Sequence, residues 1–221
     1  MGFFGKLYNA AQDKIGKIKS TISNVIGKAT NFMKNIPQIG IQIHNSDPEM
    51  LKYAKFAKEA YVDTENRKRE IENYFYDIEK SDTTTAIYID DKNMIISYRG
   101  TAGLNDIGSD ISIVKGDVEN DDRFKRDLET AMKYKDIFRL ILTGHSLGGS
   151  IAKYVSDKLS VPAYLFNAGA GLNYLNSMKN SLVKSYKVIG DVISYLGNDT
   201  NTYLINGKEG LNPHTIDNFI Y

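Results

Sequence analysis

Gly144-His145-Ser146-Leu147-Gly148-Gly149 is the stretch of sequence that decides the fold. It contains the pattern G-x-S-x-G, with the serine at position 146. An apolar run rich in strand-forming residues precedes it at 138–143, and apolar residues at helical spacing follow it at Ile151, Ala152, Val155 and Leu159. This setting predicts a strand, a sharp turn that carries the serine, and a helix. Glycines belong on both sides of the serine because larger side chains would collide within the turn.

A serine in such a turn is typical of a nucleophile. The helix that follows points its N-terminus at Ser146, so the backbone N–H of Leu147 can donate to a developing oxyanion. The simpler interpretation is a glycine-rich turn with a surface serine. The strand before it and the helix after it favour the catalytic interpretation.

A serine nucleophile needs a general base, and the chain has three histidines. His44 precedes the region in question. His145 lies inside the turn, where its side chain is expected to point away from Ser146. His214 is the histidine downstream of the turn, so it is the predicted base.

An acid must orient the base, and α/β-hydrolases carry it between the serine and the histidine in the chain. Residues 185–189 predict a strand, and Asp191 follows its end, which makes Asp191 the preferred acid. Asp199, in a predicted turn, is the alternative. Asp157 belongs to the helix after the turn and is expected to face solvent.

Further motifs complete a family resemblance. Arg99-Gly100-Thr101 follows a predicted strand, residues 143–149 read Thr-Gly-His-Ser-Leu-Gly-Gly, residues 190–193 read Gly-Asp-Val-Ile, and a histidine comes late. In combination these motifs resemble the class 3, fungal-type, lipases, from about residue 50 to the C-terminus. Those lipases are α/β-hydrolases that act on acylglycerols or phospholipids.

The resemblance implies roles for particular residues. Ser146 would be the nucleophile, Asp191 the acid and His214 the base. Thr101 and Leu147 would supply the oxyanion hole. The place of the family's lid falls on residues 102–109, which are short and polar here, and this departure argues against strong interfacial activation. Residues 166–170 also depart from the family, which has a Pro-containing turn there.

Composition agrees with one hydrolase domain. The 221 residues are long enough to bury a sizeable core, and 42% of them are hydrophobic. There is no cysteine, so disulfides and thiolate metal sites are excluded. The histidines show no ligand spacing, and we expect neither a metal nor a cofactor. We find no signal-peptide pattern and no apolar run long enough to span a membrane, which favours an intracellular or particle-associated protein peripheral to membranes.

The net charge of +1 hides an asymmetry. Residues 1–36 contain six lysines, one aspartate and no arginine, and their apolar residues follow spacings of three and four. This pattern predicts a basic amphipathic helix. The residues of its stripe are Phe4, Tyr8, Ala11, Ile15, Ile18, Ile22, Val25, Ala29, Phe32 and Ile36.

Three interpretations of residues 1–36 remain open. The helix binds an anionic membrane surface, packs on the hydrolase domain, or associates with a second copy of itself. The lysines and the aromatic residues near the start favour the membrane. Nucleic acid is not an expected partner, because the apolar stripe is broad and arginine is absent.

The predicted domain organisation has three parts. Residues 1–36 form the basic helix, 37–48 a linker, and 49–221 an α/β-hydrolase domain with a mainly parallel sheet flanked by helices. The helices expected within the domain are 49–62, a charged and exposed helix over 65–80, 121–134 and 173–180. The expected strands are a hairpin over 84–89 and 94–98, and then 161–166, 184–189 and 202–205.

These patterns predict a serine esterase that hydrolyses lipid esters at a membrane surface. Two alternatives remain. One is an esterase of small molecules with the N-terminus as a tether, and the other is a membrane-binding structural protein with an inactive hydrolase fold. The sequence does not give the acyl chain, the head group or the oligomeric state.

Overall fold

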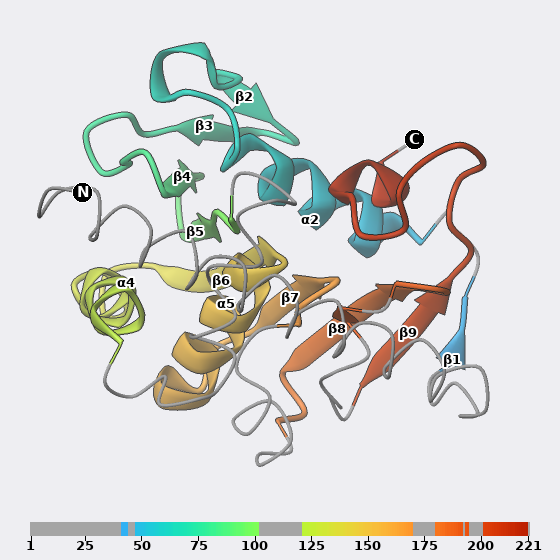
Figure 1. The fold of residues 1–221 in the computed structure, drawn as a ribbon. Coiled ribbons are helices and arrows are strands. Elements are labelled where there is room, and N and C mark those ends of the chain that lie inside the picture. Colours follow the sequence, from blue (N-terminus) through green and yellow to red (C-terminus); the bar gives the residue numbers. More distant parts are fainter. Residues whose placement is uncertain are drawn as a thin grey trace, which may run out of the picture.

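The chain folds around a mainly parallel sheet with helices on both faces (Figure 1). The computed structural model describes residues 41–43, 47–101, 121–169, 180–191, 193–194 and 201–220. Its architecture is the α/β class that the sequence predicts. The predicted N-terminal helix, the lid position 102–109 and residues 173–179 lie outside the described residues.

Nine strands of the described residues form one sheet, in the order β1-β9-β8-β7-β6-β5-β4-β3-β2. Neighbours from β1 through to β5 in that order are parallel, and those from β5 to β2 are antiparallel. The carboxyl ends of β5, β6, β7 and β8 therefore share one edge, where open α/β sheets carry their sites. The strands are β1 (Ile41–Gln42), β2 (Glu70–Ile71), β3 (Tyr74–Tyr76), β4 (Thr85–Ile89), β5 (Asn93–Tyr98), β6 (Arg139–His145), β7 (Ala163–Phe166), β8 (Val183–Val188) and β9 (Thr202–Ile205).

Two apolar cores lie on the two faces of the sheet. Helix α2 (Pro48–Glu59) and the short 3-10 helix η3 (Ile216–Phe219) pack on one face with an aromatic-rich core. Helices α4 (Asp122–Met132) and α5 (Leu147–Leu159) pack on the other (Figure 1). The central strands are buried on both sides, which explains why they read as continuous apolar runs.

Buried hydroxyls tie α2 to the sheet. Ser97 of β5 donates from Oγ to the carbonyl of Phe56 at 2.8 Å. Oγ1 of Thr143 in β6 lies 3.3 Å from the carbonyl oxygen of Tyr53 and 3.0 Å from that of Tyr164, so its single proton is shared between α2 and β7. The C-terminal end of α2 is thereby held close to the carboxyl ends of β5 and β6, where the functional residues gather.

Most predicted elements of the domain occur within a few residues of their expected bounds, and one is wrong. The sequence predicts a charged helix over 65–80, but the 3-10 helix η1 (Thr64–Asn66) and the hairpin of β2 and β3 occupy this region. Glu72 and Asn73, both with positive φ, make the two-residue turn between these strands. The turn buries Ile71 and Tyr74 against the sheet, a gain in apolar burial that an exposed helix would not have.

Residues of the predicted linker also take part in the sheet. Ile41 and Gln42, within 37–48, form β1 and pair parallel with Tyr203 and Leu204 of β9. This pairing makes β1 the last strand at that side of the described sheet.

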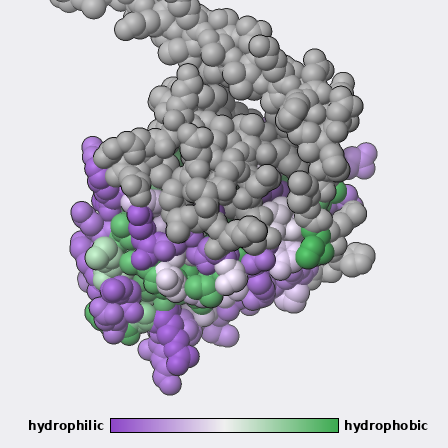
Figure 2. Space-filling model, turned by 90° about the horizontal axis from the view of Figure 1, so that it is seen from below, coloured by the Kyte–Doolittle hydropathy of each residue, from purple (hydrophilic) through white to green (hydrophobic). Residues whose placement is uncertain are grey.

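One face of the described domain is largely hydrophilic where it is coloured in Figure 2. Hydrophilic residues dominate the coloured part of the face in Figure 2, with smaller apolar areas between them. None of the described helices has the length and apolar character needed to cross a bilayer. Two of the large exposed apolar residues, Phe75 and Ile78, line one pocket. The large exposed apolar residues are Ile41, Phe75, Ile78, Met132, Ile137, Leu182 and Leu211.

Candidate active site

The turn between β6 and α5 holds Ser146 in a backbone conformation that few non-glycine residues adopt. Its φ is 57° and its ψ is −126°, which costs about 1–3 kcal/mol. The surrounding backbone enforces this conformation, because the N–H of Ser146 donates to the carbonyl of Phe166 at 3.0 Å. A Cβ on Gly144 would lie 2.3 Å from the carbonyl oxygen of Gly148. The steric reason for the glycine pattern is therefore the crowding within this turn.

Gly148 brings α5 against the end of β5. A Cβ on this residue would lie 2.0 Å from the carbonyl oxygen of Tyr98. Because two backbone segments cannot move apart cheaply, we expect Gly148→Ala to lower the free energy of unfolding by at least about 1–3 kcal/mol. At temperatures well below its unfolding transition, the variant should also hydrolyse esters more slowly than the wild type. Thermal unfolding and activity measured together check this, and an unchanged transition temperature would contradict the close approach.

Three predicted site residues meet at the end of the sheet. The Oγ of Ser146 lies 2.9 Å from Nε2 of His214, and Nδ1 of His214 lies 2.9 Å from Oδ2 of Asp191. All three residues are buried. A carboxylate only accepts hydrogen bonds, so Nδ1 carries the ring proton and Nε2 is free to accept the hydroxyl proton of Ser146. A general base beside a serine needs this tautomer.

Separate loops present the acid and the base. Asp191 follows β8 after Gly190, whose φ of 92° reverses the chain. Its Oδ1 accepts the N–H of Ile193 at 3.1 Å, which orients the carboxylate. The N–H of His214 donates to Oδ1 of Asn212 at 2.9 Å.

Asn218 stabilises the loop of the base from inside. It is fully buried, and its Nδ2 lies 2.8 Å from the carbonyl of Asn212 and 3.1 Å from that of Thr215. Its Oδ1 accepts the N–H of Lys208 at 2.8 Å. Nothing in the sequence marks Asn218 for this role, because an asparagine in a loop looks like an ordinary turn former.

The two predicted oxyanion residues flank the nucleophile. Tyr98 pairs with Gly144, so the segment that leaves β5 runs beside the turn. A Cβ on Gly100 would lie 3.1 Å from Cβ of Ser146, and Thr101 is the next residue. Leu147 is the first residue of α5, at a helix end whose N–H groups have no acceptor within the helix.

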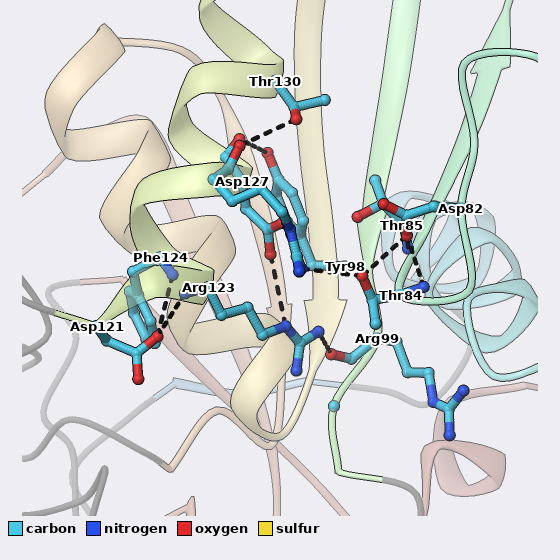
Figure 3. A network of polar contacts seen from close by, with 12 residues as sticks. Asp82, Thr84, Thr85, Tyr98, Arg99, Asp121, Arg123, Phe124, Asp127 and Thr130 are labelled. Carbon is cyan, nitrogen blue, oxygen red and sulfur yellow. Dashed lines mark hydrogen bonds and ion pairs between the residues drawn. The ribbon is translucent and has the colours of Figure 1, made fainter.

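A largely buried ion pair supports the segment leading to Thr101 (Figure 3). Arg123 of α4 donates from Nη2 to the carbonyl of Arg99, and its Nε lies 3.6 Å from Oδ2 of Asp127. Burial lowers the pKa of Arg123 and raises the pKa of Asp127, while the opposite charge of each opposes that effect in the other. The sequence gives no sign of this support, because charged residues on a short helix usually face solvent.

The remaining candidate residues from the sequence are two aspartates and two histidines. Asp199, the alternative acid, and His44 lie outside the described residues. The side chain of His145 contacts the hydroxyl of Tyr61 and the carbonyl oxygen of His214. The expectation that Asp157 faces solvent is wrong, because its side chain is 2% exposed and pairs with Lys153 at 2.7 Å. Their ion pair lies between successive turns of α5, where the surrounding residues exclude water from both charges.

The model of the Tle-like phospholipase domain, described as phospholipase-like, matches residues 52–220. The chain belongs to this family. This membership agrees with the lipase family resemblance that the sequence motifs predict. No curated protein matches this chain in sequence.

Several solved lipases are similar to this Tle-like chain. Rhizomucor miehei lipase, in its propeptide complex, is 18% identical with a TM-score of 0.47, over 67% of this chain and 62% of that one. The lipase from Rhizopus microsporus is 19% identical with a TM-score of 0.44, over 63% of this chain and 65% of that one. A nonglycosylated lipase of Yarrowia lipolytica is 15% identical with a TM-score of 0.42, over 66% and 73%. The chain thus spans less than two thirds of the first two lipases.

Proposed function

We propose that this protein hydrolyses carboxylic esters of lipids, acylglycerols or phospholipids, with Ser146, His214 and Asp191 as its catalytic triad. The observation that carries the proposal is the buried chain of two 2.9 Å contacts from Oγ through the imidazole to the carboxylate. The strained turn at Ser146 and membership in a phospholipase-like family support it further.

In the first half of the reaction, Oγ of Ser146 forms a bond to the ester carbonyl carbon while Nε2 of His214 takes the hydroxyl proton. The carbonyl electron pair moves onto oxygen, and the N–H groups of Thr101 and Leu147 hold that oxyanion. When the intermediate collapses, the C–O bond to the alcohol breaks and the alcohol takes the proton from Nε2. Asp191 stabilises the imidazolium between these steps.

In the second half, water gives a proton to Nε2 of His214 as its oxygen attacks the acyl carbon. The bond from the acyl carbon to Oγ of Ser146 then breaks, and Oγ takes the proton back. The fatty acid is released and the enzyme returns to its starting state. This sequence needs no metal or cofactor.

The test is fatty-acid release from a panel of phospholipids and acylglycerols, on vesicles and in detergent, beside a short soluble ester. The Ser146→Ala variant is the control. Fatty-acid release from lipids by the wild type, with none by Ser146→Ala, supports the proposal. Hydrolysis of the short ester without any lipid would favour the small-molecule esterase, and no hydrolysis at all would favour the structural protein with an inactive fold.

We further propose that residues 1–36 form a separate segment that binds an anionic membrane, joined to the domain through 37–48. Its support is the sequence pattern of lysines along an apolar stripe. Each lysine near an anionic surface contributes up to ~1 kcal/mol. Burial of the apolar side chains adds to this, and the ordering of a helix that contains Gly5, Gly16 and Gly27 opposes it.

Deletion of residues 1–36 is expected to abolish binding to anionic vesicles while hydrolysis of a short soluble ester stays within about twofold of the wild type. Vesicle sedimentation and ester assays on the same preparations measure this. A matched variant with the six lysines replaced by glutamine keeps the apolar stripe and should bind anionic vesicles more weakly. If the deletion instead unfolds the domain and leaves vesicle binding unchanged, the segment is part of the fold and the membrane proposal is wrong.

A further inference from the structure

The hydroxyl of Tyr61 lies where three segments of the site meet. Tyr61 follows the end of α2, and its Oη accepts the N–H of Gly100 at 3.1 Å. The same oxygen lies 2.8 Å from Nδ1 of His145, inside the turn of the nucleophile. On the other side of that ring, Nε2 of His145 lies 2.5 Å from the carbonyl oxygen of His214. One series of contacts thus joins three segments. They are the oxyanion segment, Arg99-Gly100-Thr101, the turn at Ser146, and the loop that carries His214.

The direction of each hydrogen bond in this series of contacts follows from its last acceptor, the carbonyl oxygen of His214. The carbonyl of His214 has no proton to give, so Nε2 of His145 must carry one. A neutral ring then has a lone pair on Nδ1, and Tyr61 must donate to it. The carbonyl of His145 itself is a poorer acceptor for Tyr61, at 3.3 Å. Burial lowers the pKa of His145 to about 3, so the ring stays neutral and this order persists at ordinary pH.

We propose that Tyr61 and His145 are positioning residues of the hydrolysis, which hold the oxyanion segment and the base at fixed places around Ser146. The inference rests on the proposed function. Neither side chain touches the reacting atoms in this scheme. Each acts through a neighbour, Tyr61 through the Gly100 backbone and His145 through the backbone of His214.

The peptide group between Arg99 and Gly100 is held on both of its polar atoms. Arg123 donates to its carbonyl oxygen, and Tyr61 accepts from its N–H. A peptide group is planar, so two such contacts fix how it is turned. The next N–H along the chain belongs to Thr101, and only φ and ψ of Gly100 separate it from that plane. Holding the plane therefore restricts where the oxyanion donor can point.

The atoms around Gly100 leave no space for a side chain at this position. A Cβ there would lie 2.2 Å from Oη of Tyr61 and 2.6 Å from the carbonyl oxygen of His145. Tyr61 is itself fixed, because the buried Arg67 donates from Nε to the carbonyls of Glu59 and Val62 at 3.1 and 3.0 Å. These carbonyls lie on either side of Tyr61 in the chain.

The test compares Tyr61→Phe with Tyr88→Phe. Tyr88 is a matched control, since it is fully buried on β4 and its hydroxyl donates to the carbonyl of Lys68 at 3.0 Å. Direct loss of an oxyanion donor costs about 10²–10³-fold in kcat, so we expect an indirect loss in Tyr61→Phe of about tenfold to hundredfold. The KM for p-nitrophenyl butyrate should be unchanged. Tyr88→Phe should keep kcat within about twofold, and equal kcat values in the two variants would overturn the positioning role.

Two measurements test the network without any turnover. Imidazole ¹⁵N shifts should show the neutral Nε2–H form of His145 in the wild type. Hydrogen exchange at the Gly100 amide should become at least about tenfold faster in Tyr61→Phe and stay unchanged in Tyr88→Phe. The Nδ1–H form, or unchanged exchange in Tyr61→Phe, would overturn the inference. A wild type that shows this network but hydrolyses no ester would instead contradict the proposed function.

Discussion

Ser146→Ala is expected to lower kcat for ester hydrolysis by at least about 10³-fold and to leave the fold intact. The nucleophilic oxygen is lost, so the covalent step cannot begin. The backbone conformation of φ 57° and ψ −126° is as accessible to alanine as to serine, and the neighbouring glycines still relieve the crowding. Fatty-acid release and circular dichroism measured on the same preparation separate the two effects.

Ser185→Ala is the matched control for this experiment. Ser185 is a buried serine of β8 whose hydroxyl has no hydrogen-bond partner among the described residues. Its loss should leave activity within about twofold of the wild type, because it touches no part of the site. A fluorophosphonate probe should label the wild type and Ser185→Ala at Ser146, and should not label Ser146→Ala. Labelling of another serine in the wild type would show that the nucleophile is elsewhere.

The turn at Ser146 could be predicted because its constraints are local. The crowding that requires Gly144 and Gly148 arises among residues of the turn and the strand end beside it. The order of serine, acid and histidine along the chain then left few candidates for Asp191 and His214. With few aspartates and histidines to choose from, and a triad geometry that requires contact, the order of residues predicts that Ser146, Asp191 and His214 lie together.

The supports of the site could not be predicted in this way. Tyr61 lies 84 residues before His145, its partner, and Asn218 acts on carbonyls of its own loop. Neither residue type suggests such a contact, because it exists only once the strands have assembled. The hairpin at Glu72 and Asn73 was missed for a related reason. Burial of two apolar residues against the finished sheet outweighs the helical preference of a charged segment.

Asp191→Asn is expected to lower ester hydrolysis by about 10³–10⁴-fold without unfolding the domain. Oδ1 of Asp191 accepts the N–H of Ile193 at 3.1 Å, and Oδ2 accepts from His214 at 2.9 Å. In the variant the amide oxygen keeps the bond to Ile193, so the NH₂ group faces Nδ1 of His214. An amide donor there forces the ring proton onto Nε2, and His214 can then no longer accept the proton of Ser146.

The same substitution at Asp199 tests the choice between the two acids that the sequence leaves open. Asp199→Asn should keep the rate within about twofold of the wild type, because the contact to Nδ1 of His214 belongs to Asp191. Rates on the short soluble ester, with thermal unfolding of each variant, separate lost chemistry from lost structure. Should Asp199→Asn cripple hydrolysis while Asp191→Asn stays mild, Asp199 is the acid. The tautomer of His214 would then be set by a contact other than the one at 2.9 Å.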